Sequence, residues 1–123
     1  MMKIFALLGA LNMLVAVGFG AFGAHGLKDR VDAAMLSVWQ TGVLYHLVHA
    51  LGLFVIAWLV ERTGSNLLGI AGWIMLAGII LFCGSLYLLV LTDTRMLGAI
   101  TPFGGICFLL AWALTAWAIW RLP

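Results

Sequence analysis

Charged residues are scarce in this chain. Of its 123 residues only 8% are charged, with six Lys and Arg against four Asp and Glu. Soluble domains carry about a quarter charged residues, so a chain that is 66% hydrophobic with a mean hydropathy of +1.22 is expected to be an integral membrane protein. The few basic residues cannot form the basic face that nucleic acid requires, which excludes nucleic acid as a partner.

Cysteine and proline are also rare, with two residues of each. Cys83 and Cys107 lie inside apolar runs without metal-ligand spacing, so we interpret both as small buried hydrophobic residues. The four carboxylates fall in predicted loops beside basic residues, where solvated charge pairs are their ordinary role. The sequence therefore offers no catalytic dyad or triad, and we predict no catalytic residue and no cofactor.

Four long apolar runs predict four membrane spans at about residues 4–24, 42–60, 67–91 and 103–120. Their lengths are close to the roughly 20 residues that cross a hydrocarbon core. The first run exceeds the apolar core of about 7–15 residues in a signal peptide, so we expect it to be retained. The predicted fold is an all-α integral membrane protein, a four-transmembrane-helix bundle formed by a single domain over residues 1–123.

A charged interval separates the first two predicted spans. Lys28, Asp29, Arg30 and Asp32 must lie outside the hydrocarbon, while the apolar residues between 27 and 41 recur at helical spacing. This pattern predicts an amphipathic interfacial segment over about residues 27–41, anchored by Trp39 and continuing into the second span.

The most polar part of any predicted span runs from Trp39 to Gly52. At about 100° per residue, Trp39, His46 and His49 share one sector of the helix, and Tyr45 lies one turn before His49. We interpret them as one polar seam that fixes the packing of neighbouring helices. The candidate seam residues are His25, Trp39, Tyr45, His46, His49, Ser85, Tyr87 and Thr101. If the span starts near Gly42, His49 lies on the order of 10 Å below the polar face.

A metal site is the competing reading of the histidines. His46 and His49 are close enough in sequence to share an ion, and His25 could approach from the loop. No carboxylate or cysteine stands at a spacing that completes a familiar ligand set, so we predict no metal.

Small residues and one amide line one stripe of the first span. They recur every three or four residues, at Gly9, Asn12, Ala16, Gly20 and Gly23. Such a stripe is typical of a surface against which another helix packs closely.

The polar groups gather at one membrane face. Four spans put both termini on one side and the first and third loops on the other, with three Lys and Arg on each side. The positive-inside rule therefore gives no preference, and the free amino terminus favours cytoplasmic termini. The polar groups lie on the face of the first and third loops, opposite the termini, where the candidate surface contacts are Lys28, Arg30, Asp93 and Arg95.

Four motifs spread over nearly the whole chain resemble a known family. They are Gly20-Ala-Phe-Gly-Ala-His-Gly-Leu27, Tyr45-x-x-x-His49-Ala50, Phe82-x-Gly-Ser-Leu-Tyr87 and Gly98-x-x-Thr-Pro-x-Gly-Gly105. The chain is similar to the YgdD/YwdK-like small bacterial membrane proteins, also called domain of unknown function 423. The resemblance implies an inner-membrane protein of about four helices, and it brings no activity with it.

Two functional hypotheses remain. The asymmetry of the two faces favours a binding or accessory protein whose polar face contacts a membrane-protein partner, a lipid headgroup or another copy of itself. The alternative is a homo-oligomeric transporter or channel, with the small-residue stripe as the contact and His49 as a pH-sensitive group. No span carries a charged residue, which disfavours the transporter.

Overall fold

The computed structural model describes all residues from Met1 to Pro123, and all its regular secondary structure is helical. Four continuous helical segments are long and apolar enough to cross a membrane, which confirms the predicted fold class. The first segment is α1 (Met2–Phe22) followed by the π-helical η1 (Gly23–Leu27), and the second is α2 (Ala33–Thr63). The third consists of α3 (Asn66–Gly78), the π-helical η2 (Ile79–Cys83) and α4 (Gly84–Thr92). The fourth begins with the 3₁₀-helical η3 (Arg95–Ala99) and continues as α5 (Thr101–Trp120).

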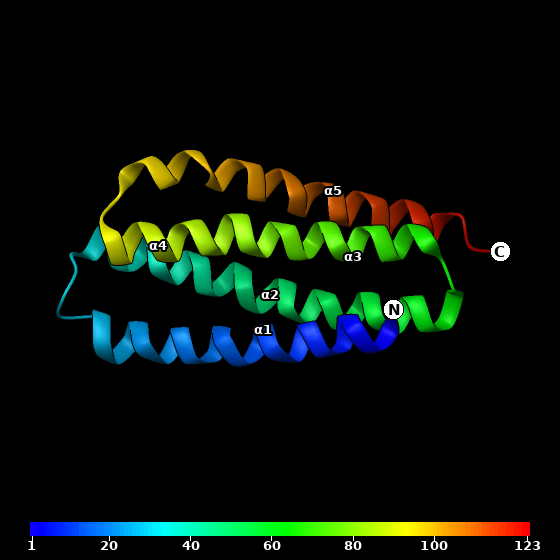
Figure 1. Cartoon of the computed structure of the whole chain (residues 1–123), viewed down its shortest axis with the longest axis horizontal. Helices are drawn as coiled ribbons and strands as arrows, with labels where there is room; N and C mark the ends of the chain where they lie inside the picture. Colours follow the sequence, from blue (N-terminus) through cyan, green and yellow to red (C-terminus); the bar gives the residue numbers. More distant parts are fainter.

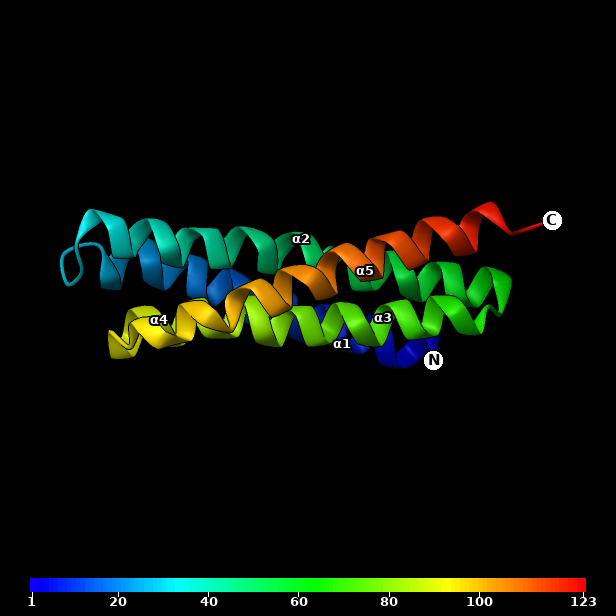
Figure 2. The same cartoon turned by 90° about the horizontal axis from the view of Figure 1, so that it is seen from above.

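The helix α2 and the α3–η2–α4 segment form a central pair, with α1 packed on one side and α5 on the other (Figures 1 and 2). Half of the most apolar stretch of each central segment is buried inside the protein, against 17% for the outer segments that contain α1 and α5. Most of the surface of α1 and α5 is therefore left to face lipid.

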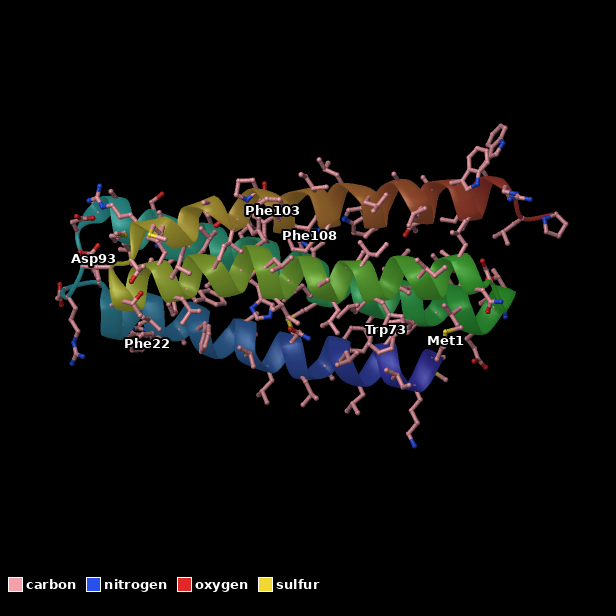
Figure 3. All side chains as sticks on the ribbon, turned by 45° about the horizontal axis from the view of Figure 1, so that its top comes forward. Met1, Phe22, Trp73, Asp93, Phe103 and Phe108 are labelled. Atoms are coloured by element: carbon pink, nitrogen blue, oxygen red, sulfur yellow. The ribbon has the colours of Figure 1, made fainter.

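The two ends of the bundle differ in what they carry. Both termini and the α2–α3 turn lie at one end, called here the terminal end (Figure 1). The connections α1–α2 and α4–α5 lie at the other, called the loop end. Figure 3 shows Asp93 at the loop end and Met1 near the terminal end, beside α3.

The start of α2 differs from the expected interfacial helix, which was to begin near Leu27. The chain instead continues α1 through η1 to Leu27, turns, and begins α2 at Ala33. Asp32 is the reason, because its Oδ1 accepts the Met35 amide at 2.8 Å and so satisfies an amide that is unpaired at a helix start. From Ala33 onward the segment is continuous with the span.

The α2 helix is longer than a membrane is thick. Its 31 residues extend about 46 Å at 1.5 Å each, against a hydrocarbon core of about 30 Å. Four exposed tryptophans gather toward the terminal end, namely Trp58, Trp73, Trp117 and Trp120. Since tryptophan prefers the membrane interface, this end lies near headgroup level, and roughly 15 Å of α2 at the loop end extends beyond the hydrocarbon.

The small-residue stripe of α1 faces α2 within the same chain. A Cβ atom added to Gly9 would lie 2.9 Å from the Phe54 ring, and one added to Gly23 would lie 2.6 Å from the Trp39 ring. Ala16 on the same stripe is fully buried, and Gly20 lies against Val43. The missing side chains thus let α2 and its aromatic rings approach α1, and the stripe is not a surface open to a second copy.

Candidate functional site

The predicted polar seam divides into two separate sites. His46 and His49 are both only 4% exposed, but His46 faces α1 and α4 whereas His49 faces α5. Three residues turn a helix by about 300°, so the two side chains diverge by about 60°. Because α1 packs beside α2 and α5 lies on the other side of the central pair, that angle is enough to send them to different neighbours (Figure 1).

His46 joins three helices by hydrogen bonds. Its Nδ1 lies 2.9 Å from the Tyr87 hydroxyl of α4, and its Nε2 lies 2.9 Å from Oδ1 of Asn12 on α1. The Asn12 amide nitrogen donates to the Leu8 carbonyl at 2.8 Å. Asn12 Oδ1 can only accept, so Nε2 of His46 carries the hydrogen, and the Tyr87 hydroxyl donates to Nδ1. The result is one directed chain, from Tyr87 through His46 and Asn12 to Leu8.

Trp39 and Tyr87 form an aromatic cluster beside this chain, toward the loop end. Their ring centroids are 4.7 Å apart, and Phe19 contacts Tyr87 edge-on at 4.7 Å. Trp39 is 1% exposed and its indole N–H donates to the Phe19 carbonyl at 2.8 Å. Trp39 is therefore held inside the protein rather than at the membrane surface, where we expected it as an anchor.

His49 has the opposite tautomer. The Trp112 indole can only donate, and it donates to Nε2 of His49 at 3.0 Å. The remaining hydrogen is on Nδ1, which donates to the Tyr45 carbonyl at 2.7 Å. Both ring nitrogens are thus occupied. His49 lies about 24 Å along α2 from Ala33, and since roughly 15 Å of α2 at the loop end extends beyond the hydrocarbon, it lies on the order of 10 Å inside the core.

An aromatic pocket lies beside His49 between α2 and α5, with a volume of about 520 Å³. The His49 ring stacks on Phe108 with centroids 3.5 Å apart and planes 10° apart, and Tyr45 lies nearly parallel to both rings. Figure 3 shows Phe108 on the side of α5 facing the central helices. The pocket is lined by Tyr45, His49, Phe82, Pro102, Gly105, Ile106, Phe108, Leu109 and Trp112.

Three other predicted seam residues lie outside the two histidine sites, whereas Tyr45 lines the aromatic pocket. Ser85 and Thr101 hydrogen-bond each other at 2.6 Å and join α4 to the start of α5, and Ser85 also donates to the Phe82 carbonyl at 2.9 Å. His25 is exposed in η1 at the loop end and joins neither histidine site. Tyr45 is 41% exposed along α2.

The charged loops meet at the loop end. Arg30, Asp32 and Asp93 border a groove of about 360 Å³, and Asp32 and Arg95 border a second of about 260 Å³. Met35 contributes to both grooves, with valines and leucines of α2 and α4 beside it. Of the predicted surface contacts, Arg30, Asp93 and Arg95 are thus brought together, while Lys28 lies exposed in the preceding turn.

The buried polar groups are fully paired. Every buried side-chain nitrogen and oxygen has a hydrogen-bond partner, and no group of three or more His, Cys, Asp and Glu side chains could hold a metal ion. Cys83 is buried and Cys107 half-buried, and both are free thiols.

Of the nine pocket residues only Tyr45 and His49 were candidate site residues, and the sequence did not indicate a role for three aromatic ones, Phe82, Phe108 and Trp112. The spacing of Gly105, Phe108 and Trp112 at i, i+3 and i+7 does place them on one face of α5. Nothing in that spacing says that the face meets His49, which lies 63 residues from Trp112.

These features define an α-helical multi-pass membrane protein. The family described as "Protein of unknown function (DUF423)" matches residues 19–105, and the chain belongs to this family. The membership agrees with the resemblance of the four sequence motifs.

Its relatives carry membrane-protein names. The chain is 55% identical over 112 residues to the UPF0382 membrane protein YwdK of Bacillus subtilis, covering 90% of this chain and 91% of the relative. It is 50% identical over 111 residues to a UPF0382 membrane protein of Staphylococcus epidermidis, covering 90% of each. A third relative, SSP2132 of Staphylococcus saprophyticus, is 49% identical over 90% of this chain and 92% of its own length. No solved structure matches the chain.

Proposed function

We propose that the chain is a binding or accessory protein whose loop end docks onto a membrane-protein partner. The observation that carries this proposal is the meeting of the two loops around Met35, where both signs of charge surround an apolar floor. Methionine adapts its shape to a partner, and mixed charges fix the partner's register.

The charge balance favours a protein over a lipid headgroup. The loop end carries three basic residues, Lys28, Arg30 and Arg95, against three acidic residues, Asp29, Asp32 and Asp93. An anionic lipid surface attracts a cluster of basic residues, whereas a net charge of zero with both signs interleaved suits a loop that also carries both signs. A second copy of the chain is the other occupant with this chemistry.

The test is cross-linking in native membranes of a bacterium carrying this chain, with charge variants. Arg30→Gln with Arg95→Gln removes two charges without touching the Asp32 helix cap. Arg62→Gln at the terminal end is the matched control. We expect one heteromeric band that the double variant loses and the control keeps. A ladder of self-multiples would instead identify a homo-oligomer, and a band insensitive to both variants would contradict the proposal.

We further propose a bacterial cytoplasmic membrane as the location, with both termini in the cytoplasm. Bacterial relatives named membrane proteins support the location. The amino-terminal charge on the terminal end supports the orientation, because Lys and Arg are otherwise equal on the two sides. The docking surface would then face away from the cytoplasm.

The geometry does not favour the transporter alternative. His49 has no free ring nitrogen, since Trp112 and the Tyr45 carbonyl occupy both. The transporter hypothesis uses the small-residue stripe of α1 as the contact between two copies of the chain, but this stripe packs on α2 of the same chain.

A further inference from the structure

From the aromatic pocket between α2 and α5 we infer a binding site for a lipid-soluble, flat conjugated ring that carries a carbonyl acceptor, the chemistry of a prenyl quinone. The inference goes beyond the proposed docking function, because it concerns a different surface and a different kind of ligand.

The depth of the pocket favours a lipid-soluble ligand. Tyr45 and His49 lie about 27 and 21 Å from the terminal end of α2, measured along the helix. Both depths fall within a hydrocarbon core of about 30 Å that starts near the tryptophans of that end. The outer wall is α5, whose Ile106 and Leu109 are 59% and 75% exposed to lipid. A ligand therefore enters sideways from the bilayer.

The walls favour a planar ring over a saturated acyl chain. The rings of Tyr45, His49 and Phe108 are parallel to within 18°, and Phe82 lies 4.6 Å from Tyr45 and 5.5 Å from Phe108 between ring centroids. Offset stacking gives a planar ring a directional gain that an acyl chain lacks. This aromatic wall distinguishes the pocket from the aliphatic face that α1 presents to lipid.

The polar groups of the pocket favour an acceptor on that ring. The Tyr45 backbone carbonyl accepts a hydrogen bond from the His49 side chain, but the Tyr45 hydroxyl makes no hydrogen bond within the protein. Tyr45 lies near the loop-side edge of the hydrocarbon, where a hydroxyl still gains from a hydrogen-bond partner. The Trp112 indole already donates to His49, which leaves Tyr45 as the donor for a ligand carbonyl.

The glycine of the pocket supplies a direct test. A Cβ atom on Gly105 would have Phe82 as its nearest neighbour, at 3.9 Å, so a larger side chain fits without moving the helix. Gly105→Leu should therefore obstruct the pocket beside Phe82 and leave the fold intact. Phe103→Leu is the matched control, because Phe103 is 63% exposed on the same helix and lies outside the pocket.

The experiment measures tryptophan quenching in nanodiscs on titration with a prenylated naphthoquinone. The comparison compound is a saturated isoprenoid alcohol of the same tail length, which has no ring. Its binding is measured by how far it displaces the quinone and so restores the fluorescence. We expect saturable quenching by the quinone, loss of the saturable part in Gly105→Leu, and two- to tenfold weaker binding in Tyr45→Phe from one lost hydrogen bond. Phe103→Leu should bind like the unaltered chain.

Three results would overturn the inference. The first is saturable quenching that survives in a Gly105→Leu protein whose helical circular dichroism and melting temperature are unchanged. The second is that the ringless alcohol displaces the quinone as well as unlabelled quinone does. The third is that the unaltered chain shows no saturable quenching. The second result would identify a site for lipid tails without ring selectivity. None of these results bears on the cross-linking at the loop end.

Discussion

The indole N–H of Trp112 donates to Nε2 of His49 at 3.0 Å and ties the last helix to the middle of α2. Removing it leaves a histidine lone pair unpaired at hydrocarbon depth. We expect Trp112→Phe to lower the free energy of unfolding by about 1–3 kcal/mol, measured by chemical denaturation in detergent. Trp117→Phe is the control, because Trp117 is 55% exposed on the same helix. Equal losses in the two variants would contradict the role of the hydrogen bond.

The chain from Tyr87 through His46 to Asn12 should act as a unit. Tyr87→Phe and Asn12→Ala each remove one hydrogen bond of His46 and are expected to lower the free energy of unfolding by about 1 kcal/mol. The double variant should lose less than the sum, because both bonds share one imidazole. A double-mutant cycle measures this difference, and strict additivity would show that the two bonds are independent.

Glycines at helix contacts should not tolerate alanine. A Cβ on Gly104 would overlap the backbone nitrogen of Phe82, where nothing flexible can yield. We expect Gly104→Ala to lower the free energy of unfolding by about 1–3 kcal/mol. Gly18→Ala is the control, since nothing lies within 4 Å of its added Cβ, and it should be neutral or slightly stabilising. A stable Gly104→Ala protein would mean that η2 and α5 pack less closely than described.

Proton flux through His49 is not expected. Liposomes containing the unaltered chain should show no more pH-dependent flux than empty liposomes, and His49→Ala should change nothing. The reason is that both ring nitrogens of His49 are occupied and that its helix carries no charged residue between Trp39 and Val60. A flux that disappears in a folded His49→Ala variant would restore the transporter hypothesis.

The orientation can be read by cysteine labelling of intact cells. In a chain with Cys83→Ala and Cys107→Ala, Lys28→Cys should react with a membrane-impermeant maleimide. Arg62→Cys should react only after permeabilisation, because it lies at the opposite end of the bundle. The reverse pattern would place the termini outside the cytoplasm.

Composition and periodicity determine the fold class of this protein. Apolar runs of membrane length leave the backbone no option except helices, because unpaired amides are too costly in hydrocarbon. The α1 stripe could likewise be recognised as a packing surface from its spacing alone. The charged loop end follows from counting spans.

Tertiary structure decided where the histidines point and what surrounds them. A turn of about 60° between His46 and His49 has no consequence until α1 and α5 lie on opposite sides of the central pair. The start of α2 at Ala33 likewise depended on the Asp32 cap taking precedence over the helical spacing of the preceding residues. The aromatic pocket depends on α5 placing Phe108 and Trp112 beside a residue far away in sequence. Helical periodicity gives the direction of a side chain on its own helix, and only the packing of helices gives it a neighbour.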